Sequence, residues 1–344
     1  QRQMCIRDRF KKAAVFTDIH FGLKGNSKTH NLDCENFIDW FIEQAHEHGC
    51  ESGIFCGDWH HNRNHLNLTT MSATIRSLEK LGSNFDNFFI FTGNHDLYYK
   101  DKRDIHSVNF SRHIPGITLI NDFYQEDDVA LVPWLVDDEW KKIPNCKAKY
   151  MFGHFELPNF YMNAMVKMPE HGELRNTHFK NQEYVFSGHF HKRQQQRNIH
   201  YIGNAFPHNY ADAWDDQRGM MVLDREHSQD PLYITWNEAP KYRTTTLSSL
   251  LDTANNIIKS NMYLRVTIDL PISYEEAQFI KETYINQYNC REVTLIPKKQ
   301  IEEISTELDI SQFESVDEIV SKEINAIDSE NFNKKLLLDI YNEL

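Results

Sequence analysis

Five apolar segments of this chain each end in residues that commonly bind metal ions. The apolar runs cover residues 13–16, 53–56, 88–91, 150–152 and 184–186. Each run has the length and composition of a strand covered on both faces of its sheet. The motifs follow the runs either directly or after one residue, and they are Asp18-Ile19-His20, Gly57-Asp58-Trp59-His60-His61, Gly93-Asn94-His95-Asp96, Gly153-His154 and Gly188-His189-Phe190-His191. Because ligands at the carboxyl ends of such strands converge at one edge of a sheet, we expect the motifs to meet there.

The residue types in these motifs suit a pair of divalent cations. Two cations roughly 3.5–4 Å apart activate a water molecule and neutralise the attacking and leaving oxygens of phosphoryl transfer. A bridging carboxylate is then required, and Asp58 is the best candidate because Gly57 lets the backbone turn at the strand end. Imidazoles, carboxylates and the Asn94 amide oxygen form a mixed nitrogen and oxygen set, which suits manganese best and also allows iron, zinc or magnesium. The motifs contain no cysteine ligand, which argues against a structural zinc site.

The ordered motifs resemble those of the calcineurin-like metallophosphoesterases, whose pattern reads DxH, GD, GNHD, GH and GHxH. All five elements occur here in that order, whereas one alone would be weak evidence in a chain with 18 His. The resemblance implies an α/β fold, a four-layer αββα sandwich. Carried over residue by residue, it assigns one metal ion to Asp18, His20 and His191, the second to Asn94, His154 and His189, and the bridging role to Asp58.

The same resemblance implies catalytic roles for three further residues. His95 resembles the family's catalytic histidine, which stabilises charge or protonates the leaving oxygen. His61 matches a second histidine of the nuclease branch, three residues after the bridging aspartate, and Asp96 is expected to hydrogen-bond to the His95 imidazole. A single histidine after a strand is usually only a polar loop residue, and we interpret His60 in that way. Five histidines match no motif and are expected to face solvent: His30, His46, His48, His65 and His106.

Further stretches resemble one branch of the family, the SbcD-type nucleases. This branch includes the meiotic recombination nuclease of eukaryotes and archaea and a shorter phage recombination endonuclease subunit. Residues 57–63 resemble its GD block, residues 131–134 its IPW strand, and residues 201–204 a segment that reads YxGS or YxGT. Asn204 departs from the usual Ser or Thr, which leaves a hydroxyl contact at that position unsupported. The motifs cover residues 11–237, and the rest of the chain resembles the branch only in architecture.

Within residues 11–237, the nuclease domain, the pattern alternates strand and helix. Helical spacing of apolar residues predicts a helix around 36–45, with Asp33 as its cap, and a second helix over 70–81. Residues 159–182 form a long irregular stretch, which is either a substrate-side loop or a surface excursion.

Outside the nuclease domain the sequence predicts three shorter parts. Residues 1–10 begin without methionine and look foreign to the fold, so we treat them as an extraneous extension. Residues 238–300 predict a small α+β domain, with strands over 262–268 and 292–296 and a helix over 274–288. It resembles the capping domain that helps SbcD-type nucleases to hold DNA. The alternative is a packing domain without DNA contact.

The last part of the chain is acidic and amphipathic. Residues 300–344 hold 12 acidic and 3 basic residues, so they carry most of the net charge of -13. Apolar residues at helical spacing predict helices over 313–327 and 332–341. These resemble the helix-loop-helix by which SbcD-type nucleases grip the coiled coil of an SbcC-type ABC ATPase. We therefore expect residues 301–344 to form an ATPase-binding tail, in which residues 305–344 bind the partner. The alternative is a hairpin packed on its own nuclease domain.

These observations lead to one principal hypothesis. We expect a manganese-dependent DNA exonuclease and endonuclease, acting as a homodimeric subunit of an SbcC-SbcD-like repair or recombination complex. The alternatives are a stand-alone phosphoesterase acting on a phosphoprotein or cyclic nucleotide, and a non-catalytic scaffold of the same fold. Because the net charge opposes contact with a polyanion, the chain alone is expected to bind DNA weakly. Six scattered cysteines, and no apolar run of membrane-spanning length, predict a cytoplasmic protein of a bacterium or, if phage-encoded, of its host.

Overall fold

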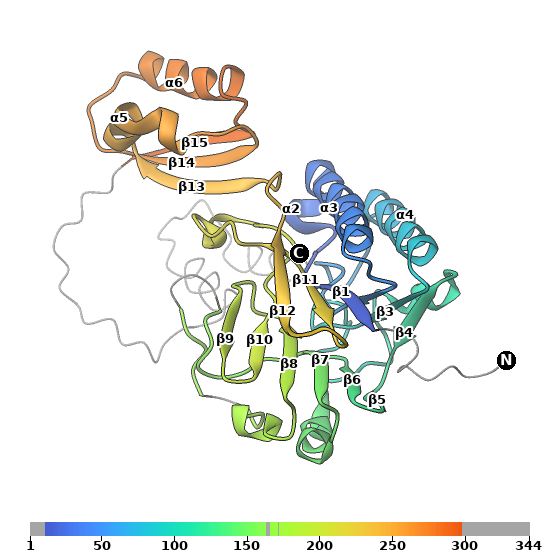
Figure 1. The fold of residues 1–344 in the computed structure, drawn as a ribbon. Coiled ribbons are helices and arrows are strands. Elements are labelled where there is room, and N and C mark those ends of the chain that lie inside the picture. The colour runs from blue at the N-terminus through green and yellow to red at the C-terminus, as the bar shows by residue number, and fades with distance from the viewer. Residues whose placement is uncertain (1–10, 163–165, 171, 298–344) are drawn as a thin grey trace, which may run out of the picture. The chain divides into compact units, whose positions relative to one another are not determined.

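Two six-stranded sheets lie face to face in the computed structural model, which describes residues 11–162, 166–170 and 172–297 (Figure 1). The first sheet has the strand order β12-β11-β1-β2-β3-β4. Strands β1 to β4 run parallel, while β11 pairs antiparallel with both β1 and β12. The strand bounds are β1 (Lys12–Phe16), β2 (Ser52–Phe55), β3 (Asn87–Phe91), β4 (Ile117–Ile120), β11 (Gly219–Asp224) and β12 (Ser228–Thr235). The first three motifs therefore follow three adjacent parallel strands.

The second sheet carries the two remaining motifs. Its strand order is β5-β6-β7-β8-β10-β9, and β6, β7, β8 and β10 run parallel. The bounds are β5 (Tyr124–Glu126), β6 (Val129–Val132), β7 (Tyr150–His154), β8 (Tyr184–Gly188), β9 (Gln194–Gln196) and β10 (Ile199–Tyr201). Strands β7 and β8 end in the motif residues His154 and Gly188, so all five apolar runs predicted as strands are confirmed.

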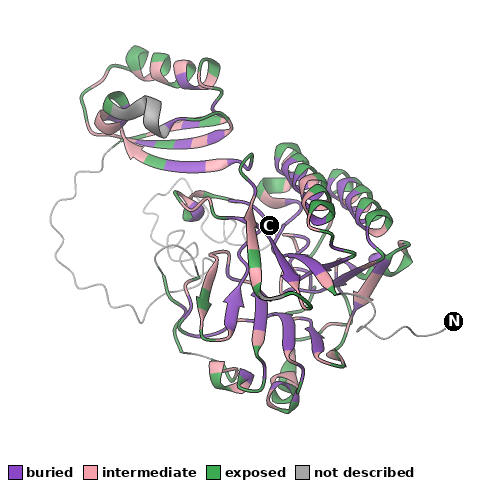
Figure 2. Ribbon diagram, in the orientation of Figure 1, coloured by how far each residue is buried: buried purple, intermediate pink, exposed green. Residues whose placement is uncertain are grey.

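Alternate residues of the buried strands enter different cores, because successive side chains of a strand point to opposite faces. Ala13 and Val15 of β1 lie in the core between the two sheets, with residues such as Phe152 from the second sheet. Ala14 and Phe16 belong instead to the core beneath α3 (Lys28–Glu47) and α4 (Leu68–Asn84), which cover the outer face of the first sheet (Figures 1 and 2). The α/β sandwich predicted from the motifs is confirmed.

The fourth layer differs in detail from the predicted sandwich. Within the described ranges, the outer face of the second sheet packs against 3-10 helices and loops rather than α-helices; these include η2 (Asp137–Asn145) and η3 (Asn176–Phe179). Pro144 lies inside η2, where it has no backbone N–H to donate and so prevents a continuous α-helix. The remaining short elements are α2 (Leu23–Asn26), η1 (Asn109–His113) and η4 (Tyr210–Asp212).

Both predicted helices of the nuclease domain are confirmed, but they are longer than predicted. Helix α3 starts at Lys28 and is capped by Ser27, whose side chain accepts the His30 N–H. Asp33 was wrongly predicted as the cap. It lies inside the helix and pairs through both carboxylate oxygens, each at 2.6 Å, with Arg291. Helix α4 is capped by Asn67 and contains the predicted residues 70–81.

A third sheet, of three parallel strands, follows β11 and β12 in the chain. It consists of β13 (Lys241–Thr246), β14 (Met262–Ile268) and β15 (Glu292–Pro297), with α5 (Leu247–Ile257) and α6 (Tyr274–Asn286). A separate apolar core that includes Leu264 and Val293 holds these elements together. The predicted strands and helix of this part are confirmed, although the helix ends two residues early. Both predicted tail helices, and residues 1–10, lie outside the described residues.

None of the helices in the described ranges is both long enough and apolar enough to cross a lipid bilayer.

Candidate metal centre

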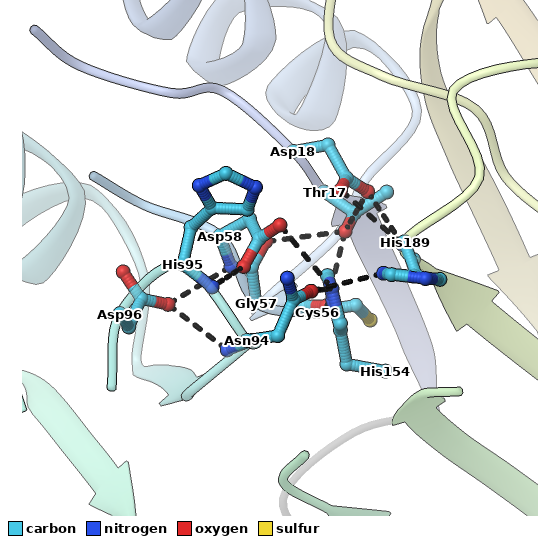
Figure 3. Close-up of polar contacts among 12 residues, drawn as sticks. Thr17, Asp18, Cys56, Gly57, Asp58, Asn94, His95, Asp96, His154 and His189 are labelled. Carbon is cyan, nitrogen blue, oxygen red and sulfur yellow. Dashed lines mark hydrogen bonds and ion pairs between the residues drawn. The ribbon is translucent and has the colours of Figure 1, made fainter. Parts of the chain in front are cut away.

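The five motifs converge where the carboxyl ends of β1, β2, β3, β7 and β8 meet (Figure 3). Backbone contacts fix their relative positions. The Asp18 N–H donates to the Gly57 carbonyl at 3.0 Å, and the His189 N–H donates to the Asp18 carboxylate at 3.0 Å. Across the two sheets, His154 Nδ1 donates to the Cys56 carbonyl at 2.7 Å. The motifs therefore meet as expected, but they come from two sheets, three from the first and two from the second, rather than from one edge of a single sheet.

The backbone is strained at four of the predicted ligand positions. Asp18, His20, Asp58 and His189 have φ angles of 51°, 53°, 63° and 89°. Residues with a side chain rarely adopt this left-handed region, although Asp and His tolerate it better than most. Such strain clusters at functional sites, where the surrounding structure holds it in place. The main chain is thus bent at the points where the ligand side chains must turn inward.

Two glycines allow the strands to approach closely enough to form the centre. A Cβ at Gly93 would lie 2.2 Å from Asp58 Oδ1, and a Cβ at Gly57 would lie 2.6 Å from His154 Nδ1. Gly57 also has a φ of 91°, which favours glycine. Space therefore requires glycine at both positions, and the turn requires it at Gly57 as well.

Asp58 lies at the junction of two groups of potential ligand atoms. One group contains Asp18, His20 and Asp58, and the other contains Asp58, His154 and His189. Asp58 Oδ2 lies 3.7 Å from His20 Nε2 and 3.4 Å from His154 Nε2. A carboxylate shared by both groups is the arrangement that a bridging ligand of two cations needs.

His191 and Asn94 complete the two groups in the way that the motifs suggest. His191 Nε2 lies 4.0 Å from Asp18 Oδ1, beside the first group. The Asn94 amide oxygen lies 2.9 Å from His189 Nδ1 and 3.2 Å from His154 Nε2, within the second group. All seven predicted ligands are consequently close together, and each joins the expected group.

The electrostatics of the centre favour a positive charge. Burial opposes ionisation of Asp58, but the charges of His154 and His95 hold its pKa well below the usual value. Although burial disfavours a charged imidazole, the carboxylates of Asp58 and Asp18 raise the pKa of His154 to about 9. Buried carboxylates that draw a proton onto a neighbouring imidazole also attract a metal cation, which competes for the same imidazole nitrogen.

His20 supplies an independent test of whether the residues fit a metal ion. Its side chain is 2% exposed, and neither ring nitrogen has a hydrogen-bond partner among the described residues. Burial lowers the pKa of His20 well below its usual value, against the charge of Asp58, so the ring is neutral and has a free lone pair. Buried polar atoms are nearly always paired. A cation bound at Nε2, the nitrogen beside Asp58, would give this nitrogen a partner. The donor set therefore fits divalent metal ions.

Asp96 has different partners from the expected ones. Its carboxylate accepts the N–H groups of Asp58, Trp59, His60 and Gly93 at 2.9–3.0 Å, and it makes no hydrogen bond with the His95 ring in the described site. Because these N–H groups belong to the turn after β2 and the turn after β3, the buried Asp96 carboxylate joins the two turns. The expected role of orienting the imidazole is corrected to one of building the backbone that carries Asp58.

His95 and His61 lie beside the centre and contact each other. The two rings stack with centroids 5.2 Å apart, and the His95 ring lies edge-on to His20 at 4.9 Å. His95 Nδ1 bonds to the His61 carbonyl at 2.9 Å. A carbonyl oxygen only accepts, so Nδ1 carries the hydrogen, and Nε2 is the nitrogen available for proton transfer.

The remaining histidines separate into buried and exposed groups. His60 is a buried polar residue whose ring bonds to Ser107 and Thr74, which agrees with its interpretation as a neighbour of the motif. Two of the histidines expected to face solvent do not: His30 is 3% exposed and His106 is 8% exposed. His30 Nε2 contacts the His20 carbonyl at 3.0 Å, and tertiary packing of this kind leaves no sequence motif.

Sequence reasoning missed two residues at the centre. The first is Glu156, whose Oε2 lies 3.0 Å from His189 Nε2. Its position two residues after His154, directly behind the GH motif, was the only feature of the sequence that could have pointed to it. His208 lies within 5.4 Å, ring to ring, of both His20 and His191. It stands in a segment without a motif, so no pattern pointed to it.

The chain is similar to Exonuclease subunit 1 of Enterobacteria phage T4, with 24% identity over 340 residues. The similarity covers 95% of this chain and 96% of that protein. No family model matches the sequence. Among solved structures, nuclease MPE of Pseudomonas putida covers 64% of this chain and 87% of its own, at 17% identity and a TM-score of 0.31. The full-length likeness to a phage exonuclease subunit agrees with the resemblance to nucleases that the ordered motifs indicate.

Proposed function

We propose that this chain is a nuclease that hydrolyses DNA phosphodiester bonds with two divalent cations, manganese being the physiological metal. The observation that carries the proposal is the position of Asp58 in both groups of ligand atoms. Two cations that share a carboxylate supply the charge neutralisation that in-line phosphodiester hydrolysis requires. That the chain is a hydrolytic nuclease also has the direct support of its full-length likeness to an exonuclease subunit.

In this proposal each ligand group holds one metal ion. Asp18, His20 and His191 belong to the first site, Asn94, His154 and His189 to the second, and Asp58 to both. The bound ions would supply an activated water and neutralise charge on the scissile phosphate. The Glu156 carboxylate accepts a hydrogen bond from His189 Nε2 and so directs Nδ1 toward the centre.

The protein's own acid and base chemistry is assigned to His95. Its Nδ1–H is committed to the His61 carbonyl, which fixes the ring and leaves Nε2 as the proton carrier. A proton held at Nε2 is available to the leaving oxygen of the phosphodiester. The His61 ring supports this position by stacking on His95.

We further propose that the chain works as part of a larger assembly. The phage relative is named as a subunit, which supports the presence of a partner protein. Residues 11–237 are assigned as the nuclease domain, 238–300 as a DNA-capping domain, and 305–344 as the segment that binds a coiled-coil ABC ATPase of the SbcC type. The proposed assembly is a homodimer of the nuclease with its ATPase, acting on DNA inside the cell during repair or recombination. Because the chain is acidic, the partner is expected to contribute much of the affinity for DNA.

Asp58→Asn tests the proposed chemistry. With Mn²⁺ and a labelled single-stranded oligonucleotide, the wild-type chain should release short products, and the variant should lose activity because the shared charge is removed. Asp101→Asn, at an exposed position after β3, is the matched control. A wild-type chain that cleaves a phosphoprotein or cyclic nucleotide but not DNA would establish the stand-alone phosphoesterase instead. A chain that binds no metal and cleaves none of these substrates would be a scaffold.

Deletion of residues 305–344 tests the proposed partner. The truncated chain should keep Mn²⁺-dependent cleavage of single-stranded DNA, and it should no longer co-purify with the ATPase when both are expressed together. Retained cleavage is the internal control for folding of the nuclease domain. Unchanged co-purification would refute the proposed role of this segment. Loss of folding would favour the alternative, in which the helices pack on their own domain.

A further inference from the structure

His208 is a buried histidine whose side chain has no hydrogen-bond partner among the described residues. It lies between β10 and η4, and its side chain is 1% exposed. Both ring nitrogens lack a partner. Burying an imidazole nitrogen without a hydrogen bond is unfavourable, so a histidine of this kind needs an explanation. His60, which is equally buried, has a partner for each of its ring nitrogens.

The His208 ring faces the first group of proposed ligands. Its centroid lies 5.4 Å from that of His20, nearly perpendicular at 88°, and 5.4 Å from that of His191 at 85°. One nitrogen from each of these three rings lies within 4.8 Å of the others. Three imidazole nitrogens at this spacing can bind one cation. Without a cation, the His20 and His208 ring nitrogens have no hydrogen-bond partner among the described residues.

The backbone that carries His208 is held firmly in place. The His208 N–H donates to Asp212 Oδ2 at 2.9 Å, and Asp212 Oδ1 lies 3.5 Å from Arg218. Arg218 is itself 1% exposed and forms a bidentate pair with Asp215. The His208 ring also packs edge-on against Phe206, with the ring centroids 4.9 Å apart. Buried ion pairs and an aromatic wall therefore position this ring, as expected for a ligand on a rigid support.

We infer that His208 is an additional ligand of the first metal ion, together with His20, His191 and Asp18. The inference rests on the proposed two-metal function and deepens it. The first site would then offer three imidazoles, whereas the second offers two imidazoles and an amide oxygen. Imidazole-rich sites prefer transition metals over magnesium, so the first site should bind Mn²⁺, Fe²⁺ or Zn²⁺ much more tightly than Mg²⁺.

Metal binding measured without catalysis tests this inference. The full-length chain is freed of metal, dialysed against a series of Mn²⁺ concentrations, and analysed for bound metal per chain. The wild-type protein should bind two ions. His208→Ala should bind one of the two roughly 10²-fold more weakly, which is the scale of loss when a metal site is disrupted. His200→Ala is the matched control, because His200 is also buried but its ring contacts Tyr233 of β12 and no proposed ligand.

Cobalt substitution gives a second readout that a packing role would not change. In the Co²⁺-loaded protein, loss of one nitrogen ligand should alter the visible absorption bands in His208→Ala and leave them unchanged in His200→Ala. His208→Gln, which keeps more of the side-chain volume, is the variant to use if the alanine variant unfolds. With His208→Gly, added imidazole should restore metal affinity.

The possible results separate the inference from the proposed function. A wild-type chain that binds fewer than two ions at saturating Mn²⁺ would overturn the two-metal proposal, and the inference with it. A wild-type chain with two ions, and a folded His208 variant with unchanged affinity and unchanged cobalt bands, would overturn the inference alone. Selective weakening of one site, with recovery by imidazole, would support it.

Discussion

Replacing Asp96 by asparagine should destabilise the protein because of the backbone hydrogen bonds that the carboxylate accepts. Its Oδ2 accepts the N–H groups of Asp58 and Gly93, each at 2.9 Å, and its Oδ1 accepts those of Trp59 and His60, each at 3.0 Å. An asparagine side chain has one carbonyl oxygen and one NH₂ group. Two of the four buried N–H groups would therefore face another donor in Asp96→Asn.

The expected magnitude follows from these two stranded donors. A buried donor left without an acceptor costs about 1–3 kcal/mol, so the two together should lower the free energy of unfolding by about 4 kcal/mol. The measurement is urea unfolding followed by tryptophan fluorescence at pH 8. Burial and the charge of Asp58 raise the pKa of Asp96 to about 6, so the wild-type carboxylate is ionised at this pH. Asp101→Asn, at an exposed position, should change the free energy of unfolding by less than about 0.5 kcal/mol.

The same variant decides between two roles for Asp96. If the carboxylate anchors the turns, Mn²⁺ affinity should fall together with stability, because the turn after β2 carries Asp58. A variant with unchanged stability and metal content, but a reduced cleavage rate, would refute this reasoning. That result would restore the expectation that Asp96 acts through the His95 imidazole.

Three further substitutions make separate points about the centre. Gly93→Ala places a Cβ 2.2 Å from Oδ1 of Asp58, the proposed bridging ligand, so metal analysis should find both ions lost or weakly held. Two tightly bound ions in this variant would show that Asp58 does not need glycine at position 93. Glu156→Gln should weaken one metal site by roughly 10- to 100-fold in calorimetric titration, because the His189 ring loses its charged partner; an unchanged isotherm would rule out that orienting role. His95→Ala should keep both metal ions and lose roughly 10²-fold in the rate of DNA cleavage. Loss of metal in that variant would instead identify His95 as a ligand.

Much of the fold was predictable because its signals are local. The runs before Asp18, Asp58 and Asn94 are short and continuously apolar, as expected of strands covered on both faces, and they are strands. The carboxyl ends of neighbouring parallel strands meet by geometry, which explains the convergence of motifs within each sheet. The division of the motifs between two facing sheets was not predicted. The fourth layer was not predictable in detail, because 3-10 helices have no strong periodicity of apolar residues.

The parts that sequence could not supply depend on contacts between distant segments. Asp33 has the residue type of a helix cap, but its partner Arg291 lies 258 positions away, and Ser27 occupies the cap. His208 reaches the centre only because the chain folds back after β10. Asp96 stands next to His95 in sequence, yet its carboxylate accepts backbone groups from another turn. Each correction concerns the partner of a side chain, which a single sequence does not record.

The left-handed backbone at Asp18, His20, Asp58 and His189 has a consequence for evolution. A residue with a side chain loses roughly 1–2 kcal/mol in this conformation relative to glycine, so four such positions together amount to about 4–8 kcal/mol. The net free energy of unfolding of a whole domain is of comparable size. Glycine at any of these positions would relieve this backbone strain, but it would remove a donor atom and, at Asp18 and Asp58, the acceptor of a backbone N–H. Relief of backbone strain therefore works directly against the ligand set of this centre at all four positions.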